Sequence, residues 1–269
     1  MVWIPFWSSR QKPDAAAGPL APTDAAAKCP VDHTKLMQHP PAAAAAGAAM
    51  CPVDHTKFDP TTNMPANLSA TQRVPGQKLA LPTERTMSSI PRGDDPDEGV
   101  WEYPSPQQML NAMVRKGHTD TPEADVPAMV DVHNYLNEGA WAEILQWEKK
   151  YEDVSGKEPR LLRFTGRPND LSPRARLMQA LGTVYPSKFG GPPPFDRHDW
   201  TVLRFASDGS KREVRYVIDY YSGPLEDGYP SFYLDVRPAF DSFASVYDRA
   251  EVWTSAVLEK ALGRGGRVE

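Results

Sequence analysis

The residues best suited to chemistry near the start of the chain are two cysteines, each inside an identical seven-residue string. Cys-Pro-Val-Asp-His-Thr-Lys occurs at 29–35 and again at 51–57, and these copies hold the only cysteines of the sequence. A Cys-Pro pair can present a thiolate to ferric haem, so Cys29 and Cys51 are candidate iron ligands. A zinc site completed by the histidine of each copy, a Cys29–Cys51 disulfide and two thiols without a role stay open as alternatives.

Histidines are the candidate ligands in the rest of the chain. Beyond the first 82 residues there are His118, His133 and His198 and no cysteine, which excludes covalent cysteine catalysis there. The sequence has no nucleophile elbow, phosphate-binding loop, dinucleotide fingerprint or His-Glu-x-x-His motif. His133 and Asn137 are four residues apart, so they would share one face of a helix. A histidine of this kind is often only structural, and the spacing alone leaves its role open.

Patterns of apolar residues predict the elements that position these side chains. We expect helices over 106–117, 128–150, 173–182 and 239–262, and strands over 199–206, 213–221 and 232–236. The second helix contains Gly139, where it can divide into two pieces. The last helix carries Phe240, Phe243 and Tyr247 on one stripe, which is typical of a helix that covers a sheet.

Composition divides the chain into a tail and a domain. Eleven of the 28 prolines lie in the first 80 residues, beside alanine runs and few bulky apolar residues, so this part cannot offset its ordering entropy. We therefore predict a disordered tail over 1–82, a folded domain over 83–262 and a C-terminal tail over 263–269. The fold class is predicted to be α+β, with helices packed around a small antiparallel sheet.

Charge and hydropathy restrict the partners. Residues 81–269 carry 23 Lys and Arg against 30 Asp and Glu, an acidic balance that argues against nucleic acid as a partner and suits a basic protein. No run of about 18 apolar residues occurs, so no membrane-spanning segment is expected. The first residues include Trp3 and Trp7, which could rest at a membrane interface.

Seven short blocks together resemble one family, the holocytochrome c synthases or cytochrome c haem lyases. They include Val-His-Asn-Tyr-Leu-Asn-Glu-Gly-Ala-Trp, and in order they cover 89–92, 101–105, 132–141, 172–176, 194–200, 213–221 and 234–239. The Cys-Pro-Val copies also fit, because family members carry such motifs in their N-terminal tails. The resemblance extends over essentially the whole predicted domain.

The resemblance implies roles for individual residues. It implies that His133 ligates haem iron, with Asn137 and Glu138 beside it as further catalytic residues. Trp101 and Tyr103 match aromatic positions near haem, and His198 and Arg204 match functionally sensitive ones. Arg204 is a candidate partner of a haem propionate, with structural support of the sheet as the alternative; Arg174 and Arg176 are further propionate candidates. The two tail cysteines would then capture haem or regulate the enzyme.

The implied activity is a lyase reaction of cytochrome c maturation. The resemblance implies that the chain binds haem b and apocytochrome c, or cytochrome c1, and joins the haem vinyl groups to the thiols of a Cys-x-x-Cys-His segment. It also implies a location in the mitochondrial intermembrane space, peripheral on the inner membrane. A haem chaperone or sensor without lyase activity and a zinc-binding adaptor that uses the tail repeat are the alternatives.

Overall fold

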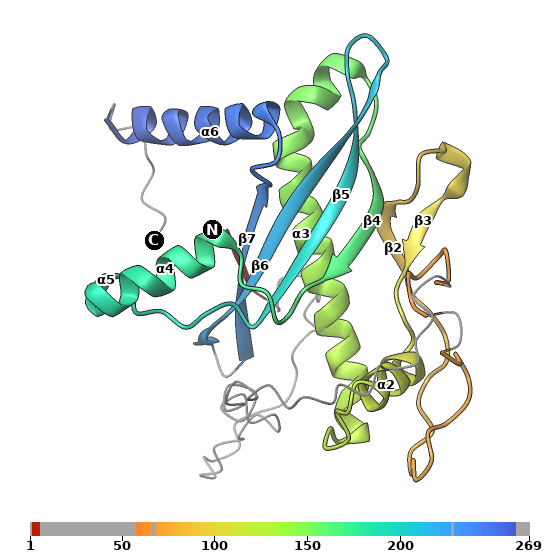
Figure 1. The fold of residues 1–269 in the computed structure, drawn as a ribbon. Helices are drawn as coiled ribbons and strands as arrows, with labels where there is room; N and C mark the ends of the chain where they lie inside the picture. Colours follow the sequence, from red (N-terminus) through yellow and green to blue (C-terminus); the bar gives the residue numbers. More distant parts are fainter. Residues whose placement is uncertain (1, 6–57, 66–67, 227–228, 262–269) are drawn as a thin grey trace, which may run out of the picture.

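A five-stranded antiparallel sheet with a long helix along one face forms the centre of the molecule (Figure 1). The computed structural model describes residues 2–5, 58–65, 68–226 and 229–261. The strands are β1 (Val2–Pro5), β2 (Met87–Pro91), β3 (Val100–Glu102), β4 (Arg160–Gly166), β5 (Asp196–Phe205), β6 (Lys211–Glu226) and β7 (Tyr229–Pro238). The α-helices are α2 (Pro106–Arg115), α3 (Val126–Ser155), α4 (Pro173–Val184), α5 (Pro186–Phe189) and α6 (Phe243–Ala261), and the 3-10 turns are η1 (Pro96–Glu98) and η2 (Glu123–Asp125). The predicted α+β class is confirmed.

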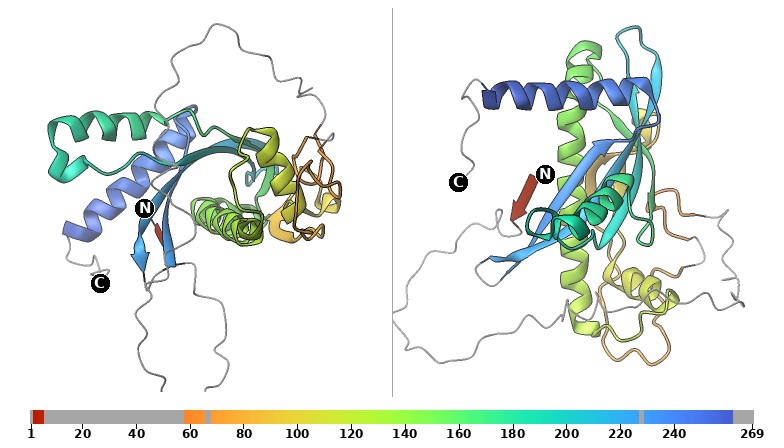
Figure 2. Two further views of the ribbon diagram at one scale, coloured as in Figure 1. Left: turned by 90° about the horizontal axis from the view of Figure 1, so that it is seen from below. Right: turned by 60° about the vertical axis from the view of Figure 1, so that its left-hand side comes forward.

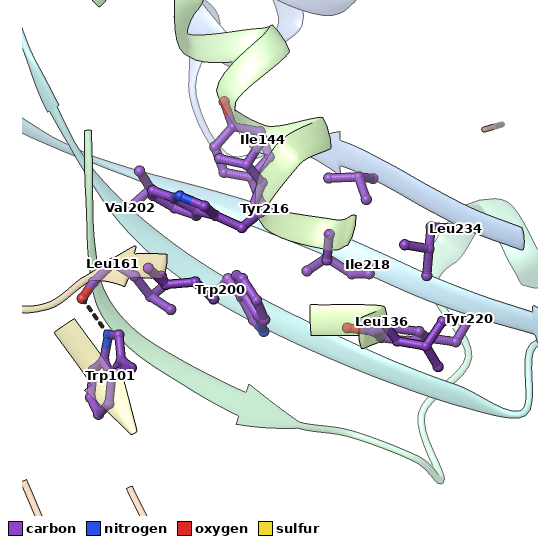
Figure 3. Packing of buried hydrophobic residues seen from close by; sticks show 14 of the residues in the cluster. Trp101, Leu136, Ile144, Leu161, Trp200, Val202, Tyr216, Ile218, Tyr220 and Leu234 are labelled. Carbon is purple, nitrogen blue, oxygen red and sulfur yellow. Dashed lines mark hydrogen bonds between the residues drawn. The ribbon is translucent and has the colours of Figure 1, made fainter. Parts of the chain in front are cut away.

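The sheet has the order β1-β7-β6-β5-β4, and β2 and β3 form a separate hairpin beside it. The two faces of the sheet differ because side chains alternate along each strand. Even-numbered residues such as Trp200, Tyr216 and Ile218 build the apolar core beneath α3 (Figure 3). Odd-numbered residues such as Asp219 and Arg237 are also buried, but they form ion pairs on the opposite face. Figure 2 shows α3 and α4 on opposite sides of the curved sheet.

The helix boundaries follow local signals. Ser105 caps α2 in a capping box with Gln108, and Ser172 caps α4. Helix α3 continues without a break through Gly139, from Val126 to Ser155, whereas the sequence allowed two pieces. Packing of one apolar stripe of α3 into the core outweighs the low helix propensity of a single glycine.

Helix α6 differs from its prediction both in where it begins and in the direction of its apolar face. It begins at Phe243 rather than at 239, after Ser242 accepts a hydrogen bond from the Ser245 amide. The predicted stripe does not cover the sheet, because Phe240, Phe243 and Tyr247 are 67%, 97% and 66% exposed. Amphipathic spacing shows that one face is apolar, but it cannot show which way that face points.

Part of the predicted tail packs against the domain. Thr62 and Leu81 are buried, and Leu81 joins Leu110 and Val126 in a small apolar cluster. Packing therefore extends ahead of the predicted limit at 82 into residues 58–81, and β1 also pairs with β7 near the start of the chain, because these short segments form contacts with the domain. Residues 6–57, with both cysteine motifs, and 262–269 lie outside the described residues, so the division into 1–82, 83–262 and 263–269 stays a prediction.

In the described ranges, none of the helices has both the length and the hydrophobicity that crossing a bilayer requires.

Strands β2, β3 and β4 were not predicted. Strand β4 joins the edge of the sheet through β5, with Phe164 opposite Trp200. Its sequence, Arg-Leu-Leu-Arg-Phe-Thr-Gly, lacks the alternation that marks a half-buried strand.

Candidate functional site

Helix α3 places His133 and Asn137 on one face, as their spacing predicted. The Asn137 amide nitrogen donates to the His133 carbonyl oxygen at 2.9 Å and lies 3.2 Å from the imidazole Nε2 atom. The Asn134 side-chain oxygen lies 3.2 Å from His133 Nδ1. Two amides on the same helix therefore fix the orientation of the imidazole ring.

The His133 imidazole is held in its neutral form. Burial lowers its pKa below the usual 6.5, and the electrostatic interaction with His198 acts in the same direction. The Asn134 hydrogen bond and the Asp196 carboxylate oppose this shift without reversing it. A neutral imidazole has a free lone pair at neutral pH, which is the form that binds a transition-metal ion.

Glu138 acts on Tyr103 and not on His133. Its Oε1 atom accepts hydrogen bonds from the Ser89 amide at 3.0 Å and the Tyr103 hydroxyl at 2.8 Å, and its other oxygen accepts one from the Ser89 hydroxyl. Burial and the nearby carboxylate raise the pKa of Tyr103, so the phenol stays protonated. The Tyr103 ring meets the His133 ring edge to face, with 6.0 Å between centroids. Glu138 thereby joins α3 to the β2–β3 hairpin and positions an aromatic wall.

A cavity of about 100 Å³ opens beside His133. The structure brings five of the sequence-predicted site residues to its wall: Trp101, Tyr103, His133, Asn137 and His198. They come from β3, the segment between β3 and α2, α3 and β5, so only the tertiary fold assembles them. Further lining residues that the sequence did not single out are Phe164, Trp200 and, from the segment before the domain, Thr62, Asn63 and Met64.

Aromatic side chains form much of the cavity wall. Trp101 is buried and donates its indole N–H to the Leu161 carbonyl oxygen at 3.0 Å (Figure 3). Its ring meets Phe164 edge to face at 5.1 Å, and Phe164 in turn lies 6.2 Å from the Trp200 ring. Such walls suit a flat apolar ligand. Trp200 lay within a block that resembled the family, whereas Phe164 gave no signal because β4 was not predicted.

Three buried polar atoms at this end of the core have no hydrogen-bond partner within the described residues: His198 Nδ1, Trp200 Nε1 and Tyr220 Oη. The other imidazole nitrogen of His198 contacts Asp196 Oδ2 at 3.1 Å, and the His198 and Tyr220 rings lie 5.2 Å apart. Buried polar atoms are normally paired. An unpaired group of three therefore marks a place where a ligand or water completes the site.

Arg204 lies in a different part of the core. Its guanidinium donates to both Glu148 oxygens at 2.8 Å and to Asp248 at 3.2 Å, and it stacks over the Tyr151 ring at 3.6 Å. His198 is six residues away on the same strand, which corresponds to about 20 Å. These carboxylates already use donors of Arg204, and the predicted contact between Arg204 and haem stays a prediction. The alternative, support of the sheet, fits the geometry.

Arg174, a further propionate candidate, is also engaged elsewhere. Its Nη1 atom lies 2.8 Å from both oxygens of Asp235, on the ionic face of the sheet that is opposite α3. Within the described residues, the wall of the cavity beside His133 contains none of the three propionate candidates, Arg174, Arg176 and Arg204.

Comparison of the sequence with known proteins identifies the family of the chain. The model of the family described as "Cytochrome c/c1 heme lyase" matches residues 5–253. The chain belongs to this haem lyase family. The chain is 46% identical over 259 residues to the holocytochrome-c synthase of Saccharomyces cerevisiae, and the match covers 93% of each chain. It is 41% identical over 207 residues to the holocytochrome c-type synthase of Homo sapiens, covering 74% of this chain and 71% of the human one.

The resemblance seen in the seven sequence blocks is thereby confirmed, and the chain is an enzyme of the lyase class. No solved structure matches this haem lyase. The roles of individual residues in this haem lyase are therefore argued from the geometry of its own His133 cavity.

Proposed function

We propose that this haem lyase is a holocytochrome c synthase that binds haem b through His133 and attaches it to apocytochrome c. The observation that carries the proposal is the aromatic-walled cavity around a neutral histidine. His133 and Asn137 reach it from α3, and Trp101, Tyr103 and His198 reach it from other parts of the chain. A cavity with these walls suits a flat macrocycle, and the neutral imidazole suits its iron.

In the proposed reaction, the two thiols of the Cys-x-x-Cys-His segment add across the two vinyl groups of haem. Each addition breaks one S–H bond, forms a C–S bond to the vinyl carbon next to the ring, and transfers the proton to the terminal vinyl carbon. No oxidant is needed, provided that both thiols are reduced. His133 holds one axial side of the iron and the histidine of the substrate takes the other. This arrangement places each thiol beside its vinyl group and raises the effective concentration.

The cavity must enlarge before it can hold haem. It measures about 100 Å³, whereas sites for ligands of drug size or larger are about 300 to 1,000 Å³. Its outer wall includes Thr62, Asn63 and Met64 from residues 58–65, a segment that we call the strap. We propose that the strap moves aside when haem enters.

The contacts that hold the strap are mostly polar. Asn63 donates to the Phe164 carbonyl oxygen at 2.9 Å, and Arg92 donates to the Pro60 carbonyl oxygen at 2.8 Å. Asp59 pairs with Arg85 at 3.0 Å, with about a quarter of each side chain exposed. Partly exposed polar contacts contribute little to stability, so local opening of the strap costs far less than unfolding the core.

Production of holocytochrome tests the main proposal. The chain is co-expressed with apocytochrome c in bacteria that lack their own maturation system, and covalent haem is detected by haem stain. We expect product from the wild type and none from His133→Ala. His118→Ala, which alters an exposed histidine, is the matched control and keeps wild-type yield. Wild-type yield from His133→Ala would remove His133 from the mechanism. Bound haem without product from the wild type would favour the haem chaperone.

Rapid mixing with haem tests the movement of the strap. In Asp59→Ala combined with Asn63→Ala, two anchors are lost, and we expect haem to associate about threefold faster because the open form is more populated. Asp208→Ala removes an exposed carboxylate elsewhere and serves as the control. An unchanged association rate in the double variant would contradict strap opening as the step that admits haem.

The proposal also covers the location of the enzyme and the role of the two tail motifs. We propose that the enzyme works in the mitochondrial intermembrane space, peripheral on the inner membrane, with apocytochrome c or c1 as its protein partner. Cys29 and Cys51 would capture haem without taking part in bond formation. Cys29→Ser combined with Cys51→Ser is therefore expected to form product at saturating haem and to lose yield only when haem is scarce. Loss of product at both haem levels would place the cysteines in the reaction itself.

A further inference from the structure

Helix α6 is oriented with its polar side toward the domain. Ser245 and Asp248 are each only 2% exposed, whereas Phe243, Tyr247 and Trp253 are 97%, 66% and 68% exposed. At 3.6 residues per turn, Phe243 and Tyr247 lie on the side of the helix opposite Ser245 and Asp248. An amphipathic helix of a globular domain normally buries its apolar face, so α6 is reversed with respect to the usual arrangement.

Ion pairs fix this orientation. Asp248 contacts Lys150 Nζ at 2.8 Å and Arg204 Nη1 at 3.2 Å, and it accepts a hydrogen bond from the Tyr151 hydroxyl. On the next residue, Arg249 donates to the Pro238 carbonyl oxygen at 3.1 Å. Turning the apolar face inward would break these contacts and leave Arg204 partly unpaired in the core. The outward direction of the aromatic side chains is therefore built into the fold.

The chemistry of the exposed face suits a lipid surface. Phenylalanine, tyrosine and tryptophan are the side chains that concentrate where hydrocarbon meets headgroups. Figures 1 and 2 show that α6 projects sideways from the domain, with much of its length beyond the sheet. A protein groove would instead need a partner that wraps around an already projecting helix.

The charge that follows the helix suits the same surface. From residue 262 to residue 269, directly after the helix, the sequence contains Arg264 and Arg267 against one acidic residue, Glu269. Cations next to an interfacial helix attract anionic headgroups and add to the apolar contribution.

We propose that the exposed face of α6, carried by Phe243, Tyr247 and Trp253, docks the enzyme on the surface of a bilayer that contains anionic phospholipid. The inference rests on the peripheral membrane location proposed above, and it names the surface of the enzyme that would contact the membrane. It does not depend on the lyase reaction, so the two can fail separately.

Sedimentation with vesicles tests the proposal on the full chain without haem or apocytochrome. Vesicles of phosphatidylcholine alone are compared with vesicles that also contain phosphatidylserine. We expect the wild type to sediment with the anionic vesicles. The triple variant Phe243→Ser, Tyr247→Ser and Trp253→Ser should lose about tenfold or more in partitioning, because three aromatic side chains no longer enter the interface.

A matched triple variant separates this face from general hydrophobicity. Leu177, Val184 and Tyr185 are also exposed, at 55%, 67% and 62%, but lie on or beside α4. Their replacement by serine should leave vesicle binding unchanged. Equal losses in both triple variants, or no loss in the α6 variant, would overturn the proposal, as would a wild type that binds neither vesicle. Equal unfolding temperatures of the wild type and both variants establish that the fold is intact.

Two further readouts identify what covers the helix. Brominated lipid should quench tryptophan fluorescence in the wild type, and Trp253→Phe should bind equally well but show less quenching. Light scattering in the absence of lipid reports self-association. A wild-type dimer that the α6 triple variant abolishes would show that a second copy occupies this face, and would overturn docking on lipid. Normal holocytochrome yield from that variant would leave the lyase proposal standing.

Discussion

Two polar clusters lie between α3 and the even-numbered face of the sheet, and they differ in how completely their polar atoms are paired. At one end, Arg204, Glu148 and Tyr216 satisfy one another, and Asp248 joins them from α6. At the other end, around the His133 cavity, the buried atoms His198 Nδ1, Trp200 Nε1 and Tyr220 Oη lack partners within the described residues. Both clusters are supported by the same helix and the same strands.

The difference separates a structural cluster from a binding site. An ion cluster in a low-dielectric core is tolerated only when its charges and hydrogen bonds are complete, and the Arg204 cluster meets this condition without a ligand. Unpaired polar atoms in the core reduce stability unless something binds them. Leaving them unpaired in the free protein is therefore the arrangement expected of a site that is completed by its substrate.

The largest expected effect is on stability at the Arg204 end. Arg204→Ala leaves Glu148 as a buried charge without its ionic partner and removes one of the two cations that pair with Asp248, and we expect it to lower the free energy of unfolding by about 3–5 kcal/mol. Arg163→Ala, which breaks an exposed pair with Glu213, should cost less than about 1 kcal/mol. Urea unfolding of both variants measures the contrast. Similar small losses would mean that the Arg204 cluster is not a stabilising unit.

Two tyrosines on the same face of β6 give the sharpest matched pair. Tyr216 donates to Glu148, whereas the buried Tyr220 hydroxyl has no described partner. We expect Tyr216→Phe to cost about 1–2 kcal/mol and Tyr220→Phe to be near neutral, because only the first removes a hydrogen bond.

Tyr216→Phe is expected to have the larger effect on stability, whereas Tyr220→Phe should have the larger effect on haem affinity, measured by haem titration. Tyr220→Phe is expected to weaken haem binding, and Tyr216→Phe to leave it unchanged. A loss of stability in Tyr220→Phe as large as in Tyr216→Phe would show that the Tyr220 hydroxyl is already satisfied, and would remove the contrast between the two ends.

A smaller effect is expected where Glu138 supports Tyr103. Glu138→Gln keeps the size of the side chain but weakens its acceptance from Ser89 and Tyr103, and we expect haem affinity to fall about tenfold. Combining it with Tyr103→Phe should add little further loss, because both variants break one chain of contacts. Glu143→Gln, also on α3, is the control. Fully additive losses would mean that Glu138 acts through something other than Tyr103.

The smallest effect is a difference in acid sensitivity. His133 has a lowered pKa in the folded protein, so the stability linked to its neutral form is present above 6.5 and is lost as the pH falls. Burial alone would raise the pKa of Asp248, but Lys150, Tyr151 and Arg204 hold it below 3.8, so its stabilisation is lost only in stronger acid.

As the pH falls, the stability that depends on His133 should therefore be lost before the stability that depends on Asp248. Between pH 7.5 and 5.5, His133→Gln is expected to remove about 1 kcal/mol or less of the acid-dependent loss of stability. Urea unfolding at both pH values is the measurement. An identical pH dependence in wild type and variant would show that His133 titrates as it does in the unfolded chain.

His133 and Arg204 show how far the sequence alone could go. His133 lay in a block that resembled the family, whereas Arg204 lay outside the seven blocks and was implied by the family as a functionally sensitive position; both were candidates for haem contact. The four-residue spacing predicted that Asn137 and His133 share a helix face, and the structure has them there, since helix geometry is local. Nothing local could show that Glu148 and Asp248, 56 and 44 residues away, use the donors of Arg204.

The sequence by itself determined the class of fold, most of the helices and strands of the central sheet, the pairing of His133 with Asn137, and the family. These follow from short-range signals: caps, alternation, helical spacing and contiguous motifs. Tertiary structure alone decided that α6 turns its aromatic face outward, that β4 and the strap complete the cavity, and that Arg204 pairs with Glu148 and Asp248. Each of those outcomes depends on contacts between residues far apart in the chain, and such contacts have no periodicity to read.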